Sequence, residues 1–289
     1  MAADGADVLM RRVLLAVLLP LASLALVACG GGGGQSSAKA QGAVTLAART
    51  TAGGQSYHIS TQTTLHIPQL KSPVSLSGEG VFDPRRNRGR LEIDLRNLTA
   101  VLGQPVGTAQ MELEGNVVYM RIPFLSASLP GLRPWLKVDL ARAGHTRGID
   151  LSSFLQLGQG ADPNQVLEYL RAAGHVMKIG SEKVRGVETT HYRGTIDLER
   201  VPSLAPAAQR AQLRASIRRL EQTTGRRAIP IGVWVDAQNR VRRLRYQDLL
   251  TLQQERVELN LQSDLYDFGT PVVVPLPAPG DVTDLTKGS

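Results

Sequence analysis

The fold class follows from one stretch of the chain, Tyr57-His58-Ile59-Ser60-Thr61-Gln62-Thr63-Thr64-Leu65-His66-Ile67. Its large apolar side chains stand at odd-numbered positions, and Pro68 ends it. Alternation with period two is typical of a β-strand with one buried face. We therefore predict a strand whose odd-numbered side chains point into a core.

The same alternation recurs through most of the chain. Further strands are predicted at 74–82, 91–95, 109–113, 118–122, 135–140, 176–184, 190–198, 229–235, 240–246 and 257–261. Turns are predicted at 83–87, 114–116, 185–186 and 236–239, where Pro, Gly, Asn and Asp gather.

The middle of the chain has a helical pattern instead. Asp162-Pro163 is a typical helix start and Gly174 a typical end, and a second helix is predicted at 206–223. A short third helix is predicted at 149–157. Strands with segregated helices indicate an α+β fold. We expect one large curled antiparallel sheet, a half-barrel of about ten strands, wrapped around two or three helices.

The N-terminus has the pattern of a lipoprotein signal. Arg11-Arg12 precede the apolar run Val13 to Val27, and small residues lead to Cys29, the single cysteine. We predict a signal peptide at 1–28 and a mature chain that begins at Cys29, whose thiol carries diacylglycerol. Palmitate is a further expected lipid group. A secretory signal followed by a coincidental cysteine is the alternative. Translation starts at Met1 or at Met10, and the sequence leaves this open.

Residues 29–55 are predicted to form a lipidated flexible tether, because Gly30 to Gly34 and the polar residues after them favour a coil. Residues 56–289 are predicted to form one domain. Its tail, 271–279, is rich in proline and should lie extended at the domain edge.

Composition narrows the function classes. The chain of 289 residues has a net charge of +8 and only 4% aromatic residues. A basic exported domain can approach anionic headgroups or acidic polymers. No basic stripe with interleaved aromatic residues is present in the sequence, so we expect no nucleic-acid partner.

The order of these segments resembles the LppX/LprAFG family of actinobacterial lipoproteins and, more distantly, the LolA/LolB carriers. The resemblance covers about Ser56 to Asp284. It is carried by Ser77-Gly78-Glu79-Gly80, Trp135-Leu136-Lys137-Val138, Asp162-Pro163 with Leu167, the hairpin from Gly180 to Tyr192, Ile231-Gly232-Val233-Trp234-Val235-Asp236, and Phe268-Gly269-Thr270-Pro271-Val272.

The resemblance implies a lipid carrier without catalytic residues, anchored on the extracytoplasmic side of the cell membrane. Its cavity would hold the acyl chains of a lipid or glycolipid, and a membrane transporter is a further candidate partner of the expected monomer. The candidate cavity residues are Leu91, Ile93, Leu95, Met111, Leu113, Phe124, Phe154, Leu213 and Ile217. They are core residues by default and line a cavity only if the helices stand off the sheet.

Catalytic and metal-binding patterns are absent from the sequence. The five histidines are scattered, no His-Glu-x-x-His or Gly-x-Ser-x-Gly motif occurs, and no cofactor or metal is predicted. Three hypotheses remain, namely a lipid carrier, an envelope interaction or assembly lipoprotein of the same fold with a filled core, and an exported hydrolase.

Overall fold

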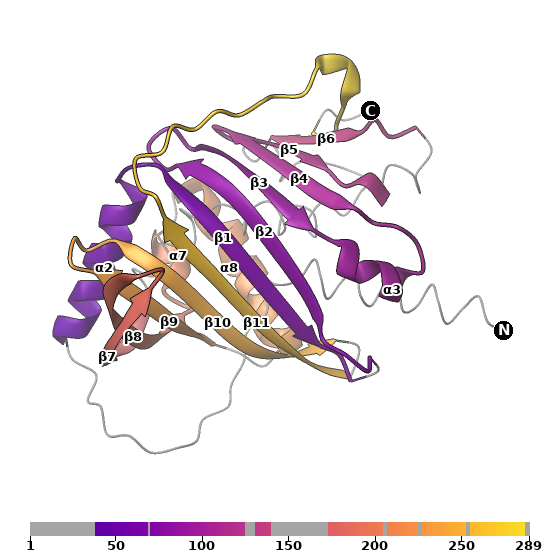
Figure 1. The fold of residues 1–289 in the computed structure, drawn as a ribbon. Coiled ribbons are helices and arrows are strands. Elements are labelled where there is room, and N and C mark those ends of the chain that lie inside the picture. Colours follow the sequence, from indigo (N-terminus) through magenta and orange to yellow (C-terminus); the bar gives the residue numbers. More distant parts are fainter. Residues whose placement is uncertain are drawn as a thin grey trace.

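The computed structural model describes residues 38–68, 70–124, 131–139, 173–204, 207–224, 227–252 and 255–286. Within these ranges, one sheet of 12 strands has the order β12-β6-β5-β4-β3-β2-β1-β11-β10-β9-β8-β7. It curls strongly (Figure 1), so the predicted half-barrel is confirmed with two strands more than the expected ten. The helix predicted at 149–157, residues 162–172 of the helix predicted at 162–174, and the signal with Cys29 lie outside the described residues. The helix end predicted at Gly174 is wrong, because a strand already begins at Ala173.

The sheet consists of two antiparallel meanders in which strands adjacent in sequence pair with each other. The first contains β1 (Tyr57–His66), β2 (Val74–Asp83), β3 (Arg88–Asp94), β4 (Thr108–Glu114), β5 (Val117–Arg121) and β6 (Trp135–Asp139). The second contains β7 (Ala173–Val184), β8 (Val187–Asp197), β9 (Ala228–Asp236), β10 (Val241–Leu252) and β11 (Glu255–Tyr266). Most of these bounds follow the predicted strands closely, because each strand buries one face. β10 and β11 extend several residues beyond the predicted 240–246 and 257–261.

One antiparallel pairing joins the two meanders. β1 pairs with β11 from His58 opposite Tyr266 to His66 opposite Glu258. This pairing makes the sheet continuous, so that side chains far apart in the sequence share one face.

The C-terminal segment adds the last strand of the sheet, next to β6. Residues 270–278 form neither helix nor strand, and β12 (Val282–Asp284) then pairs in parallel with β6. A short 3₁₀ helix, Pro279–Asp281, leads into β12. The proline-rich segment therefore lies extended and ends at the sheet edge, as predicted (Figure 1).

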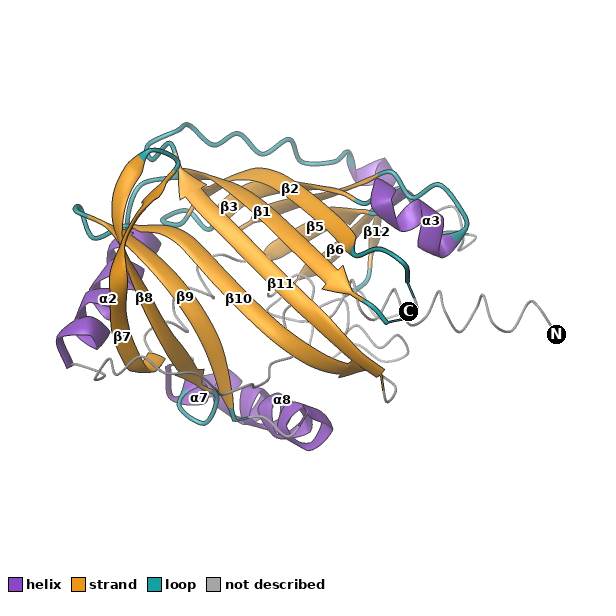
Figure 2. Ribbon diagram, turned by 60° about the horizontal axis from the view of Figure 1, so that its bottom comes forward, coloured by secondary structure: helices purple, strands orange, loops and turns teal. Residues whose placement is uncertain are grey.

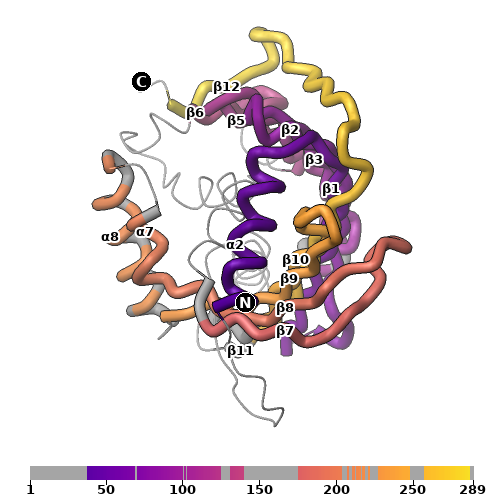
Figure 3. The backbone as a smooth tube through the Cα atoms, turned by 90° about the vertical axis from the view of Figure 1, so that its left-hand side faces the viewer, coloured from indigo at the N-terminus to yellow at the C-terminus, as the bar shows by residue number. Residues whose placement is uncertain are grey.

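The helices of the described residues are α2 (Ala38–Ala52), α3 (Thr99–Leu102, after the 3₁₀ turn Arg96–Leu98), α7 (Val201–Leu204) and α8 (Ala207–Thr224). The helix predicted at 206–223 is confirmed by α8. Figure 1 and Figure 3 show α2 across one end of the curled sheet, with α7 and α8 on the open side of the curl.

The tether predicted at 29–55 is wrong from Ala38 onward, where α2 begins. Its buried residues are Ala40, Val44, Ala47, Ala48 and Thr51, which share one helix face at spacings of three and four. They pack with Val176, Val233 and Val235 of the sheet in one core cluster. Small side chains on this face let the helix approach the strands closely, so tertiary packing orders a stretch whose glycines and polar residues favour a coil.

Candidate lipid-binding face

Figure 2 shows the curl of the sheet. The concave face, which α2 covers in part, carries the apolar core clusters of both meanders. One row runs across seven neighbouring strands with paired residues side by side. It consists of Leu265, Ile59, Gly80, Leu91, Met111, Met120 and Leu136. Large aliphatic side chains without interspersed charges form a surface on which acyl chains can pack.

Glycines allow this face to curl tightly. A Cβ atom on Gly80 would lie 2.4 Å from the carbonyl oxygen of Arg90, and one on Gly78 would lie 2.6 Å from Oγ1 of Thr61. Leu91 and Ile93 of β3 occupy the space beside these two glycines, at 3.1 and 3.3 Å from the same Cβ positions. The aliphatic side chains of β3 therefore lean over a part of β2 that has no side chains of its own.

The sequence-predicted cavity residues divide among three core clusters. Leu91, Met111 and Leu113 pack with Tyr57, Phe82 and Leu265. Ile93, Leu95 and Phe124 pack with Leu65, Leu98 and Leu259. Of these residues, Leu91, Ile93, Met111 and Leu113 lie on the neighbouring strands β3 and β4. Leu95 follows β3 directly, and Phe124 follows β5.

The helical members of the predicted set lie elsewhere. Leu213 and Ile217 of α8 belong to the cluster that contains α2 and β7–β10, and this cluster has no residue of β3 or β4. The structure therefore does not bring Leu213 and Ile217 together with the candidates of β3 and β4. Phe154 lies outside the described residues.

The degree of burial divides the predicted cavity residues of β3 and β4 and their neighbours into core residues and candidates for ligand contact. Leu95 and Leu113 are buried, whereas Leu91, Ile93 and Met111 are only half-buried on the concave face. Half-buried aliphatic side chains on a concave face are the ones that a ligand can cover. Leu91, Ile93 and Met111 are thus the strongest ligand-contacting candidates of the described residues.

A pocket of about 300 Å³ lies at the turn between β1 and β2. Its lining combines apolar side chains with Lys71 and Glu258, and the full set is His66, Ile67, Pro68, Leu70, Lys71, Ser72, Pro73 and Glu258. None of the sequence-predicted cavity residues lines it.

The convex face is polar and held together by ion pairs and stacked rings. The ring of Trp234 stacks on His191 with centroids 4.0 Å apart, and its indole nitrogen donates a hydrogen bond of 2.7 Å to Glu182. Burial lowers the pKa of His191. Trp234 lies opposite Val233 and Val235, as predicted, and these contacts cover it, so only 4% of it is exposed.

The arginine-rich strand β10 is tied to the β9–β10 turn through Asp236, whose side chain is fully buried. Burial acts to raise the pKa of Asp236, but the backbone N–H of Arg240 and the guanidinium groups of Arg242 and Arg240 hold it below its usual value. Both guanidinium groups also lie over the ring of Phe268. These arginines thus serve the fold.

Glu112 is a buried carboxyl group on the convex side of β4, opposite Arg90 and Tyr119. Burial raises its pKa to about 7, Arg90 acts in the other direction, and Glu92 adds to the rise. Its Oε2 atom has no hydrogen-bond partner in the structure. The apolar concave face lies on the opposite side of the sheet, so Glu112 has no place among the ligand-contacting candidates.

Neither metal-site geometry nor membrane-spanning length occurs in the described ranges. No group of three His, Cys, Asp or Glu side chains is arranged there to hold a metal ion. None of the helices in these ranges has both the length and the apolar character needed to cross a bilayer.

The sequence matches no family model. An uncharacterized 31.2 kDa protein in the rplA-rplJ intergenic region of Streptomyces griseus is 29% identical over 189 residues, which is 63% of this chain. The match spans 58% of the length of that relative.

Solved structures with detectable likeness include mycobacterial lipoproteins. LprF from Mycobacterium bovis is 18% identical with a TM-score of 0.46, covering 85% of this chain and 100% of that one. LppX from Mycobacterium tuberculosis is 15% identical with a TM-score of 0.46, covering 82% and 98%. A LolA superfamily protein from Nitrosomonas europaea is 9% identical with a TM-score of 0.29, covering 82% and 94%. These neighbours include the lipoproteins that the sequence resembles, but at these identities no ligand or activity carries over.

Sequence reasoning missed two parts of the site. The first is α2, whose only signal was the spacing of Ala40, Val44, Ala47 and Ala48. The second is the contribution of β1 and β11 to the apolar row, through Ile59 and Leu265. Ile59 was visible as an alternating residue, but its neighbours across the sheet depend on the β1–β11 pairing, which has no local signal.

Proposed function

We propose that this chain is an exported lipoprotein, anchored through Cys29, that binds an acylated lipid or glycolipid and carries it across the cell envelope. The observation that carries this proposal is the apolar row on the concave face, in which Leu91 and Met111 remain half-buried. The helix α2 covers the part of this face formed by β7, β9 and β10 and makes its contacts there.

The chemistry of the face fits acyl chains. Each methylene group that leaves water contributes about 0.8 kcal/mol, so a chain of ordinary length gains enough to stay bound without a specific polar contact. The half-buried residues are aliphatic or thioether side chains, which adapt to flexible chains. The affinity of this face for a lipid should therefore depend more on the length of the acyl chain than on the shape of the lipid.

The anchoring part of the proposal rests on the sequence. The signal at 1–28 would be removed, Cys29 would become acylated, and the mature chain would stay on the extracytoplasmic side of the membrane as a monomer. A membrane transporter is the proposed further partner. We propose no catalytic step, because the candidate residues are aliphatic and supply no acid, base or nucleophile.

The test uses the chain from residue 29 with Cys29→Ser, which retains every described residue and cannot be acylated. Native mass spectrometry should detect co-purified lipid, and a fluorescent fatty acid should bind in titration. Leu91→Gln with Met111→Gln should raise the Kd for the probe by at least about tenfold, because two apolar contacts are lost. Leu276→Gln, on the C-terminal segment and 48% exposed, is the matched control and should leave the Kd unchanged.

Protein that carries no lipid and takes up no probe would overturn the carrier proposal. That result would favour the alternative, an envelope interaction or assembly lipoprotein with a filled core.

A further inference from the structure

The outer face of α2 combines cations with an exposed large apolar side chain. Lys39, Gly42, Leu46 and Arg49 are exposed and follow one another at helical spacings of three and four. Leu46 is 49% exposed between the two cations. The opposite side of the same helix is buried against β7, β9 and β10, so the outer side is fixed in orientation.

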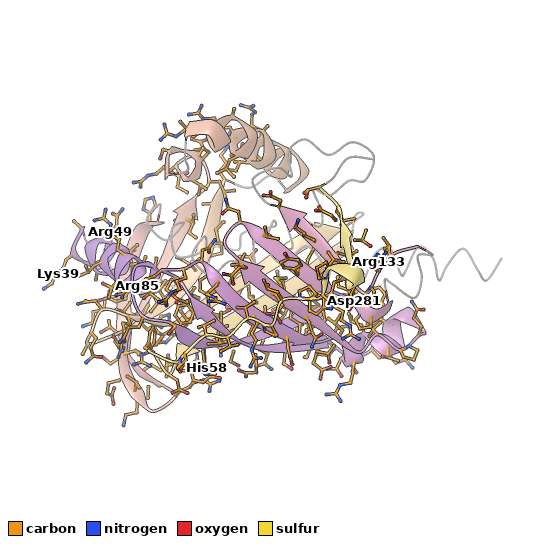
Figure 4. The ribbon with its side chains drawn as sticks, turned by 90° about the horizontal axis from the view of Figure 1, so that it is seen from above. Lys39, Arg49, His58, Arg85, Arg133 and Asp281 are labelled. Carbon is orange, nitrogen blue, oxygen red and sulfur yellow. The ribbon has the colours of Figure 1, made fainter. Side chains whose placement is uncertain are left out.

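The charge of this face has one sign. The sequence of α2 contains Lys39 and Arg49 but no Asp or Glu. Arg85 lies at the same end of the molecule (Figure 4) and donates a hydrogen bond of 3.1 Å to the carbonyl oxygen of Gly53, just beyond α2. A surface of this kind attracts anions and also offers a leucine to an apolar layer behind them.

The short segment between Cys29 and α2 limits how far the outer face of α2 can lie from the bilayer. Cys29 and Ala38, the first residue of α2, are separated by eight residues. A fully extended chain advances at most about 3.6 Å per residue, so over nine steps α2 begins no more than about 32 Å from the acylated cysteine. Of the described elements, α2 is the one that follows the anchor directly.

We propose that the outer face of α2, formed by Lys39, Leu46 and Arg49, docks on an anionic membrane surface. The inference rests on the proposed function in one respect, which is the acylation of Cys29. Docking would hold the β7–β10 side of the sheet against the bilayer, because α2 packs on those strands. Two weak attachments, the acyl anchor and this face, together give firmer binding than either alone.

A second basic helix face competes for this role. Arg214 and Arg218 are exposed on α8 at a spacing of four. The tether leads directly into α2, whereas α8 is connected to the tether only through α2 and the sheet. The α8 pair offers a matched control, because its reversal changes the net charge of the chain by the same amount.

The test measures sedimentation of the chain from residue 29 with Cys29→Ser on vesicles. One set contains phosphatidylglycerol and phosphatidylcholine in equal parts, and the other contains phosphatidylcholine alone. We expect binding to the first set that weakens as salt is raised. Lys39→Glu with Arg49→Glu should lower the partition coefficient by about 20-fold or more, because attraction becomes repulsion at two positions. Arg214→Glu with Arg218→Glu should lower it far less.

The apolar contact has its own pair of variants. Leu46→Gln should weaken vesicle binding several-fold, whereas Leu276→Gln, at nearly the same exposure, should not. If circular dichroism shows that the charge-reversal variant is unfolded, the milder double change Lys39→Gln with Arg49→Gln repeats the charge test.

Three results would overturn the docking proposal. They are an absence of binding to phosphatidylglycerol vesicles, equal losses for the α2 and α8 variants, and a loss confined to the α8 variant. Uptake of the fluorescent fatty acid, measured on the same proteins, separates this proposal from the carrier function. The α2 variants should keep that uptake, and its loss in every protein would count against the carrier function alone.

Discussion

The hydroxyl oxygen of Thr51 in α2 accepts a hydrogen bond of 2.9 Å from the backbone N–H of Val241, at the start of β10. The same hydroxyl donates a hydrogen bond of 2.8 Å to the carbonyl oxygen of Ala47. Both Thr51 and Val241 are buried. A single side chain thus links helix α2 to a strand that lies 190 residues further along the sequence.

Thr51→Val should therefore lower the free energy of unfolding by about 1–3 kcal/mol, because it leaves a buried N–H without a partner. Chemical denaturation measures this change, and Thr51→Ser should restore most of the stability. Thr50→Val, at the neighbouring half-buried position, serves as control. Equal stability of Thr51→Val and the unaltered chain would mean that α2 does not need this bond.

Asp236 provides a second prediction. Asp236→Asn should lower the free energy of unfolding by about 2–4 kcal/mol, because two partly buried guanidinium hydrogen bonds lose their buried, charged acceptor. Asp94→Asn removes the exposed Asp94–Arg96 pair and should have little effect, which makes it a matched control.

The carboxylate of Asp236 should also make the free energy of unfolding depend on pH in the acidic range. The folded state holds the pKa of Asp236 below its usual value, so the folded state releases this proton more readily than the unfolded state. The stabilisation is present above the usual carboxyl pKa and is lost as pH falls through the folded value. Asp236→Asn should abolish this part of the acid dependence in thermal melts, and an unchanged acid profile would contradict the assignment.

Glu112 should produce the opposite dependence. Burial raises its pKa from 4.5 to about 7, so between these values the folded state keeps a proton that the unfolded state has released. Stability therefore falls as pH rises from about 4.5 to about 7. Glu112→Gln should remove this fall and raise the free energy of unfolding at pH 8 by about 1–3 kcal/mol.

The check for Glu112 is a series of thermal melts across this pH range. Glu188→Gln, at the exposed β7–β8 hairpin, should leave the profile unaltered. A Glu112→Gln variant with the parent profile would show that the carboxyl group titrates normally.

Gly80 tests the tight curl of the first meander. Gly80→Ala should destabilise the fold by about 1–3 kcal/mol, because its Cβ atom would meet the Arg90 carbonyl oxygen at 2.4 Å. Gly180→Ala in β7 meets no atom within 4 Å and should be neutral or slightly stabilising. Denaturation midpoints compare the two, and equal behaviour would mean that the strands can open at no cost.

Much of the sheet was predictable because its strands bury one face and leave the other wet. Tyr57, Ile59 and Leu65 alternate with polar residues, and β1 has the predicted bounds to within one residue. The turns at Asn87, Arg185 and Asn239 adopt positive φ where the sequence placed them. These features are local, so local patterns reveal them.

The features without a local signal in the sequence depend on long-range packing. The helix α2 is held by contacts with strands far along the chain, and its own residues give a weak signal. Leu213 and Ile217 were grouped with β3 and β4 because all are aliphatic, yet their neighbours are set by where α8 lies. Residue type alone cannot assign a side chain to one of several clusters.

The pairing of β1 with β11 has a consequence for the order in which the chain can fold. Each meander can form from neighbours in sequence, but the residues joined at this boundary, such as His58 and Tyr266, are separated by roughly 200 residues. Until the final strand is available, β1 remains an open edge with unpaired backbone groups that can join another chain. An N-terminal fragment that stops before β11 should therefore aggregate, and a folding factor that shields β1 would act within that interval.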